Sequence, residues 1–400
     1  MTDVVTDPAM TSAAHGDARA VSYQDVLRTG PGTLAGRYLR MFWQPVFRAD
    51  DLASGEAKPI RIMGENFTLY RGETGTAHVV AQRCAHRGTQ LSVGTIDGDS
   101  IRCLYHGWAY DGSGQCVDQP AEPEPFCDQV RIRACPTEEY LGCVFAYFGD
   151  DDAPPLPRFP EFEHPEFLLY VRVATWNFNF FAQLENSLDY VHPVYVHKQW
   201  GWQMPRVTAT DIDAGIEARV EGAMDVPDRG FFNMPNVHEY RTPPQLWWGT
   251  SARSFARGWR VPVDDHHHLR LDVEVVPLTG ADAAVYAEAR AADEARRDRN
   301  PTDMVESILA GKESLNEIMK DPWSMPIYDL IDLQDQLAMT GLGPIADEPP
   351  PDRLGRMDVG VTRIRKLWLR ELRALTEGRR VKRDWPRPEG FWRDLTDPSR

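Results

Sequence analysis

The sequence predicts an α+β protein with a β-rich N-terminal domain and a mixed helix-and-sheet C-terminal domain. The length of 400 residues suits two domains. Short strand patterns between glycine turns fill the first part of the chain, and helical patterns become frequent in the second. Between them lies an acidic, proline-rich segment at 149–160 that suits neither a strand nor a helix. We therefore predict an N-terminal arm with a short helix at 1–40 and domains at 41–152 and 153–400.

The composition limits the classes of partner and compartment. The formal net charge of −16 argues against nucleic acid as a general partner, because no extended basic surface compensates it. No run of about 18 apolar residues is present, so no membrane span is expected. Residues 1–20 lack the apolar core of a signal peptide. We expect a cytoplasmic protein whose six cysteines, all before residue 150, include metal ligands.

Residues 43–149 carry the pattern of a small β-sandwich or barrel. Many short strands at close spacing, separated by glycine turns, are typical of such folds. The expected strands lie at 59–63, 67–71, 78–82, 101–105 and 140–148.

Two cysteine–histidine loops lie within this β-rich part. Cys84 precedes His86 by two positions, and after sixteen intervening residues Cys103 precedes His106 by three. Two thiolates and two imidazoles would suit a tetrahedral zinc site. They would also suit a Rieske [2Fe–2S] cluster, in which two cysteines hold one iron and two histidines hold the other. The cysteine-then-histidine order in both loops favours the cluster, because zinc sites usually keep like ligands together.

A second group of polar residues lies between residues 185 and 197. Asn186, Asp189 and His192 follow at three-residue steps, which on a helix would place them on one face. Pro193 predicts that this helix bends or ends before His197, since proline lacks an N–H and clashes with the preceding turn. Two imidazoles beside an acid are typical of a metal site, and we expect Asp189 to hydrogen-bond the His192 ring.

A mononuclear iron site of this kind needs a third, acidic ligand. Two histidines and one carboxylate form the facial triad of non-haem Fe(II) oxygenases. The segment 328–336 offers Asp329, Asp332 and Asp335 at three-residue steps, so spacing alone leaves the choice open.

Strand and helix patterns alternate in the rest of the C-terminal part. Leucine and valine alternate with charged residues from 269 to 275, which predicts a half-buried strand. The turn before that strand should place His267 on the buried face. Acidic, alanine-rich surface helices are expected at 281–299 and 302–320.

Three arginines, Arg253, Arg257 and Arg260, stand among aromatic residues ahead of that turn. We interpret them as strand-surface arginines. Contact with a substrate carboxylate is the alternative, because a guanidinium binds a carboxylate through two parallel hydrogen bonds.

The two metal motifs together resemble those of Rieske non-haem iron ring-hydroxylating oxygenases, in the α (terminal oxygenase) subunit. The resemblance spans about residues 30–375, and it implies an N-terminal all-β Rieske [2Fe–2S] domain and a C-terminal α+β, helix-grip-like catalytic domain with an antiparallel sheet. The matching residues are Cys84-x-His86-Arg87-Gly88, Cys103-x-x-His106-Gly107-Trp108 and Asn186-x-x-Asp189-x-x-His192-x4-His197.

The resemblance also assigns ligands to each metal. It implies that Cys84, His86, Cys103 and His106 hold the [2Fe–2S] cluster. It implies that His192, His197 and an acid hold a mononuclear Fe(II). The family places this acid after a glutamine, which favours Asp335 over Asp332, although Thr340 stands where members often have a glutamate.

Two further residues are expected to be catalytic by resemblance, Asn186 and Asp189. The family's matching acid bridges to a Rieske histidine of a neighbouring subunit, here His86 or His106. The resemblance therefore implies a homotrimer in which Asp189 takes part in electron transfer.

Three shorter segments resemble the phthalate dioxygenase and aromatic O-demethylase branch. That branch implies a separate NAD(P)H-dependent flavin and iron–sulfur reductase, and a small aromatic substrate, with or without a carboxylate group, that reacts with O2. The expected reaction is hydroxylation or O-demethylation, with phthalate-type cis-dihydroxylation and N-demethylation as alternatives. The segments are Gly32-Thr33-Leu34, Trp43-Gln44-Pro45 and Gln119-Pro120-Ala121-Glu122.

Overall fold

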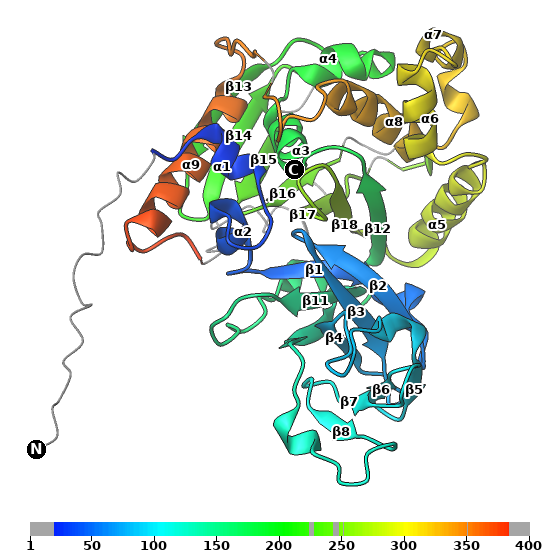
Figure 1. The fold of residues 1–400 in the computed structure, drawn as a ribbon. Helices are drawn as coiled ribbons and strands as arrows, with labels where there is room; N and C mark the ends of the chain where they lie inside the picture. Colours follow the sequence, from blue (N-terminus) through cyan, green and yellow to red (C-terminus); the bar gives the residue numbers. More distant parts are fainter. Residues whose placement is uncertain (1–19, 224–227, 243–247, 251, 350, 384–400) are drawn as a thin grey trace, which may run out of the picture.

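A computed structural model describes residues 20–223, 228–242, 248–250, 252–349 and 351–383. The chain forms an N-terminal β-domain, at the bottom of Figure 1, and a larger C-terminal domain of helices around one sheet. The α+β prediction is confirmed. None of the helices within the described residues carries an apolar stretch long enough to cross a bilayer.

The N-terminal β-domain consists of three antiparallel sheets, in the strand orders β1-β11-β10, β2-β3-β4-β9 and β5-β6-β7-β8. The predicted strand at 140–148 begins later, at Cys143, because Leu141 and Gly142 both have positive φ angles, of 50° and 72°, and form the turn between β10 and β11. The strands are β1 (Trp43–Arg48), β2 (Ala57–Ile62), β3 (Glu65–Arg71), β4 (Ala77–Ala81), β5 (Thr95–Asp97), β6 (Ser100–Arg102), β7 (Ala109–Tyr110), β8 (Cys116–Asp118), β9 (Ala134–Cys135), β10 (Thr137–Tyr140) and β11 (Cys143–Tyr147).

The C-terminal domain is built on a seven-stranded antiparallel sheet in the order β12-β18-β17-β16-β15-β14-β13. The second predicted surface helix, 302–320, is broken because Gly311 adopts a φ of 71° between α6 and α7. The strands are β12 (Leu168–Trp176), β13 (Arg206–Asp211), β14 (Gly215–Glu221), β15 (Asp228–Asn233), β16 (Val237–Arg241), β17 (Phe255–Pro262) and β18 (His268–Val276). The helices are α3 (Phe180–Leu188), α4 (His192–Val196), α5 (Gly280–Glu294), α6 (Pro301–Leu309), α7 (Leu315–Ile318), α8 (Ile327–Thr340) and α9 (Val359–Thr376).

The N-terminal arm packs on the C-terminal domain rather than on the β-domain that follows it. Its helices α1 (Tyr23–Leu27) and α2 (Leu34–Leu39) lie against α9, as Figure 1 shows. The rings of Tyr38 and Trp368 meet edge to face, with centroids 5.6 Å apart. The β-domain joins the same apolar core, because Phe145 on β11 packs edge to face on Trp259 of β17 at 5.5 Å.

The predicted half-buried strand is wrong in one respect, since β18 is buried on both faces. Its apolar residues enter the common core, and its charged residues are covered by helices. Asp332 of α8 pairs with Arg270, and Arg290 of α5 pairs with Glu274 at 2.8 Å. Alternation predicted the two faces correctly but could not show what covers the polar one.

The burial expected for His267, on the buried face, and for the arginines, on the strand surface, also differs from the structure. His267 is not the buried histidine of its turn, because its side chain is 44% exposed, whereas His268 is fully buried. Arg257 and Arg260 are each only 2% exposed, so they are not strand-surface residues. Arg257 pairs with Glu239, and Arg260 pairs with Asp272 at 2.6 Å.

Candidate metal centres and substrate pocket

The segment in which a helix was expected to bend or end at Pro193 forms two helices. Helix α3 ends at Leu188, and Asp189 is extended, with φ −90° and ψ 93°. Helix α4 then begins at His192, with Pro193 in its first turn, where a missing N–H breaks no helical hydrogen bond. Proline therefore starts the second helix instead of ending the first. The expected helical stripe does not form, and the extended Asp189 backbone sets the spacing between the two helices.

The structure brings His192, His197 and Asp335 together. The Nε2 atoms of the two histidines lie 3.5 and 3.2 Å from Asp335 Oδ1, and one ligand atom from each residue lies within 4.8 Å of the others. Asp335 lies on α8, which contacts α4. Asp332 does not join this group, because its carboxylate pairs with Arg172 at 2.7 Å and with Arg270.

Hydrogen bonds at the far ring nitrogens fix how both imidazoles are presented. His197 Nδ1 lies 2.9 Å from Gln334 Oε1, and His192 Nδ1 contacts the backbone carbonyl of Asp189. A carbonyl oxygen can only accept, so each Nδ1 carries the proton and each Nε2 presents a lone pair towards Asp335. Gln199 holds Gln334 in turn through a side-chain hydrogen bond of 2.9 Å.

The contact between Asp189 and His192 differs from the expected one. The carbonyl of Asp189, not its carboxylate, meets the ring. The carboxylate Oδ1 instead accepts hydrogen bonds from the backbone N–H groups of Val191 and His192, at 2.9 and 3.2 Å. It thereby caps the start of α4. Among the described residues Oδ2 of Asp189 accepts no hydrogen bond.

Asp335 has the environment of a carboxylate that needs a cation. Its Oδ1 is buried without a hydrogen-bond partner among the described residues. Burial disfavours the charged form, but positive charge on the His197 and His192 rings outweighs it and holds the pKa of Asp335 well below its usual range. When those rings are neutral, with the proton on Nδ1, a bound cation has to supply the positive charge. Two imidazole lone pairs and a carboxylate oxygen repel one another unless a positive charge lies between them. The donor set therefore fits Fe(II).

A cavity of about 500 Å³ lies beside the triad. That volume suits a small aromatic molecule. One wall is formed by the helical segments that carry the triad together with Asn186 and Asp189, and the facing wall by the polar face of the sheet. Its aromatic and apolar lining includes Tyr190, Trp200, Trp202, Tyr328 and Ile331, and its sheet wall includes Arg172, His238, Tyr240, Arg260 and Arg270.

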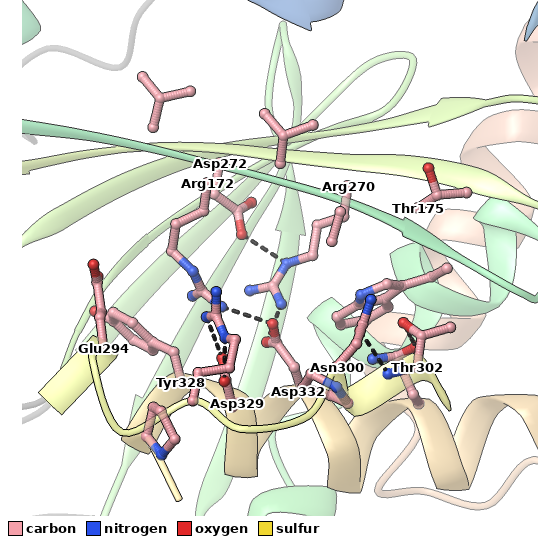
Figure 2. A pocket seen from close by; sticks show the side chains of 18 of the residues that line it. Arg172, Thr175, Arg270, Asp272, Glu294, Asn300, Thr302, Tyr328, Asp329 and Asp332 are labelled. Atoms are coloured by element: carbon pink, nitrogen blue, oxygen red, sulfur yellow. Dashed lines mark hydrogen bonds and ion pairs between the residues drawn. The ribbon is translucent and has the colours of Figure 1, made fainter. Parts of the chain in front are cut away.

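A second, more polar cavity of about 980 Å³ lies on the other side of a chain of ion pairs. Figure 2 shows this cavity, with Arg172 and Arg270 converging on Asp332 and with Asp272 beside Arg270. Arg172 and Arg270 line both cavities. These ion pairs therefore form the partition between them.

The two cysteine–histidine loops meet at the far end of the β-domain. Cys84 and Cys103 are buried, and the rings of His86 and His106 lie 4.5 Å apart between centroids. His86 stacks on Trp108 at 4.6 Å with an interplanar angle of 9°. Two buried thiols with two imidazoles beside them match the ligand set of a [2Fe–2S] Rieske cluster.

The geometry of the loops fits a cluster better than a single zinc ion. Zinc would hold all its donor atoms at bond lengths of about 2.0–2.3 Å, and therefore within about 4 Å of one another. Among the described residues, the group of three or more donor residues close enough to hold a single metal ion is His192, His197 and Asp335, and the residues of these loops form no such group. None of the six cysteines forms a disulfide. The four that lie outside the two loops are also free thiols.

Several residues of the site carry no signal that spacing could reveal. Gln334 stands next to the expected acid, and that adjacency is the one sequence clue to its role. His238 enters the pocket from β16, and nothing in its neighbourhood marked it as functional. His268 does not line the cavity. It is fully buried and bonds to the backbone carbonyl of Phe178 at 2.9 Å and to Gln183, which does line the cavity.

Comparisons with known proteins agree with this arrangement. Residues 42–140 match the Rieske [2Fe-2S] domain. The chain is 27% identical over 357 residues to the 5,5'-dehydrodivanillate O-demethylase oxygenase subunit of Sphingobium sp. (strain NBRC 103272 / SYK-6), covering 88% of this chain and 80% of that protein. It is 30% identical over 302 residues to the tert-butanol monooxygenase / tert-amyl alcohol desaturase oxygenase subunit of Aquincola tertiaricarbonis, covering 73% and 60%.

The fold is also shared with solved oxygenase structures. One is the reduced complex between oxygenase and ferredoxin in carbazole 1,9a-dioxygenase, with a TM-score of 0.60 and 19% identity over 86% of this chain and 96% of that one. The chain has a Rieske domain, relatives that are oxygenase subunits over most of its length, and the oxygenase fold. Over most of its length it is therefore similar to the oxygenase subunits of Rieske-type oxygenases.

Proposed function

We propose that this chain oxidises a small aromatic substrate with O2, by hydroxylation or O-demethylation, using electrons from a separate reductase. One observation carries the proposal: His192 and His197 present Nε2 lone pairs to the buried Oδ1 of Asp335 beside a cavity of about 500 Å³. Similarity to an O-demethylase subunit supports the demethylation branch. Phthalate-type cis-dihydroxylation and N-demethylation are the alternatives on the same scaffold.

The proposed metal ligands divide between the two domains. Cys84, His86, Cys103 and His106 would hold the [2Fe–2S] cluster; the triad, with Asp335 as its acid, would hold Fe(II). A Rieske cluster supplies single electrons, and an iron held by three residues supplies O2 activation. The imidazole rings of His197 and His192 are oriented by Gln334 and by the Asp189 carbonyl. The substrate would lie between the aromatic side chains and the sheet.

We propose that the electrons cross between subunits. Helix α4 lies at the top of the molecule in Figure 1 and the β7–β8 region at the bottom, so the two proposed metal sites of one chain are far apart. Asp189 lines the iron-site cavity and has a carboxylate oxygen that accepts no hydrogen bond among the described residues. A head-to-tail homotrimer would let this oxygen meet His86 or His106 of a neighbouring subunit. Leu104 and Tyr105, 67% and 56% exposed beside His106, supply apolar surface for that contact.

The remaining expectations concern the partner and the compartment. A flavin and iron–sulfur reductase that oxidises NAD(P)H is the proposed electron source, in line with the oxygenase–ferredoxin complex among the similar structures. Six free thiols support a reducing compartment, which we propose to be the cytoplasm.

Reductase-dependent O2 uptake tests the proposed function. Anaerobically purified protein would be mixed with a reductase, NAD(P)H and a panel of methoxylated and unsubstituted aromatic acids. Formaldehyde release would identify O-demethylation, and diol products would identify dihydroxylation. Asp335→Ala is expected to abolish substrate-dependent uptake while it retains the cluster spectrum. Uptake at the wild-type rate in Asp335→Ala would refute the assignment of the iron site.

A further inference from the structure

The sheet wall of the iron-site cavity holds two buried polar side chains with unused hydrogen-bonding atoms. Arg260 on β17 is 2% exposed and His238 on β16 is 6% exposed, and both line the cavity. Arg260 Nε and His238 Nε2 are buried without partners among the described residues. Buried polar atoms are nearly always paired, so two unpaired ones facing one cavity indicate a missing ligand.

Both side chains lie on the same face of the sheet. His238 pairs in register with Gly258, and Arg260 lies two residues further along the same strand, so the two are diagonal neighbours. Gly258 leaves room for the guanidinium of Arg260 and the carboxylate of Asp272, because a Cβ there would collide with Asp272 Oδ1 and Arg260 Nη1. The guanidinium of Arg260 lies over this glycine, held by Asp272 at 2.6 Å.

The charges in this wall do not balance. Arg172, Arg260 and Arg270 share two carboxylates, those of Asp272 and Asp332, and within the described residues they form no other ion pairs. One positive charge is therefore left over beside the cavity. An uncompensated charge in a buried site is costly, and an anionic ligand would remove that cost.

The ring of His238 complements this charge. Burial, reinforced by Arg260, lowers the pKa of His238 to about 3, so the ring is neutral at pH 7. A neutral imidazole offers one N–H donor and one acceptor. It adds a donor beside Arg260 without adding a second positive charge.

We propose that Arg260 and His238 form a carboxylate-binding subsite, which holds an aromatic acid on the sheet wall while its oxidised group faces the triad. The inference rests on the proposed function and narrows its substrate class to aromatic carboxylates. Arg260 supplies the charge-assisted bonds and His238 a neutral donor. The aromatic lining then packs on the ring of the substrate.

Binding of 3-methoxybenzoate and of its neutral amide, 3-methoxybenzamide, tests the subsite. Isothermal titration calorimetry on the anaerobic holoenzyme would give both dissociation constants. We expect the wild type to prefer the carboxylate by about tenfold or more. Arg260→Gln should raise the dissociation constant of 3-methoxybenzoate about 10- to 100-fold and change that of the amide less than about threefold, so the preference disappears.

Two more variants keep the test decisive. Arg229→Gln is the matched control, since Arg229 also lines the cavity but its side chain is 36% exposed and pairs with Glu217 at 2.6 Å. It should leave the preference intact. His238→Leu removes no hydrogen bond within the described residues, so it should keep the unfolding midpoint and weaken both ligands about three- to tenfold.

The outcomes separate the subsite from the proposed function. Equal affinity for the acid and the amide, no binding of the acid, or an unchanged preference in Arg260→Gln would overturn the subsite. If Arg260→Gln does not fold, an unchanged affinity in His238→Leu would overturn it. A wild type that prefers the acid but shows no O2 uptake with any aromatic acid would overturn the proposed function and leave the subsite standing.

Discussion

Replacing Gln334 with leucine should weaken iron binding although Gln334 is not itself a ligand. Its Oε1 accepts the hydrogen bond from His197 Nδ1 at 2.9 Å, in a site where His197 is 4% exposed. Leucine of similar size would leave that N–H buried and unpaired and would free the ring to rotate. The loss of one such bond should destabilise the folded protein by about 1–3 kcal/mol. Loss of a partner behind a metal-bound histidine typically lowers metal affinity about 10- to 100-fold.

An anaerobic competition assay with a chelator would measure this change. The affinity for Fe(II) should fall about 10- to 100-fold in Gln334→Leu, while the visible spectrum of the cluster is retained. Gln334→Glu keeps an acceptor at the same place and should restore most of the affinity.

Gln336→Leu is the matched control for this prediction. Gln336 lies on the same helix, is 2% exposed, and accepts a hydrogen bond from Thr302 at 2.9 Å, away from the triad. Its replacement should lower stability by a similar amount and leave the iron affinity unchanged. Equal iron affinity in Gln334→Leu and the wild type would refute the orienting role of this amide.

The remaining predictions concern four other positions. Asp189→Ala should retain both metals and lose reductase-dependent turnover, as measured by metal content and O2 uptake; full activity would refute the proposed electron path. Asp332→Asn should keep the iron but, because it removes the charge that pairs with the buried Arg270 and the partly buried Arg172, lower the free energy of unfolding by about 3–5 kcal/mol in a denaturant titration. Gly258→Ala should displace Arg260 and weaken binding of 3-methoxybenzoate, whereas Gly30→Ala, where a Cβ meets open space, should not. Burial lowers the pKa of His268 to about 3, so below about pH 6.5 the unfolded chain takes up a proton that the folded chain does not. The free energy of unfolding should therefore fall by about 1.4 kcal/mol for each pH unit as the pH is lowered from about 6.5 to about 3. His268→Gln should flatten this slope in denaturant titrations, and an unchanged slope would contradict the neutral state of the buried His268.

Local spacing was sufficient to predict the two cysteine–histidine loops. Each loop closes through two backbone hydrogen bonds. In the first loop Gly88 N–H donates to the Cys84 carbonyl at 2.9 Å and Cys84 N–H to the Thr89 carbonyl at 2.9 Å; in the second, Gly107 N–H donates to the Cys103 carbonyl at 3.1 Å and Cys103 N–H to the Trp108 carbonyl at 2.8 Å. Because the ligands of each loop lie within a few residues, the sequence already contains their relative placement.

The choice between Asp332 and Asp335 depended on tertiary contacts. Both acids lie on α8 three residues apart, so spacing could not separate them. Arg172 and Arg270, from strands distant in the sequence, occupy Asp332 and leave Asp335 for the histidines. The polar face of β18 was misread for the same reason, since alternation does not reveal which helices cover a face.

Pro193 was misread because proline has two opposite meanings in a helix. It ends a helix in the interior but is favoured in the first turn. The extended Asp189, whose carboxylate caps the next helix, decided between the two. That cap was visible in the sequence only as an acid three residues before His192.

Metal and sulfide analysis of the anaerobically prepared protein tests the central claim most directly. The account predicts about three irons and about two acid-labile sulfides per chain, because one cluster and one mononuclear iron are bound. In His197→Ala the iron content should fall to about two while the sulfide content and the red-brown spectrum persist. Zinc without acid-labile sulfide, or a His197→Ala variant that retains all its iron, would contradict it.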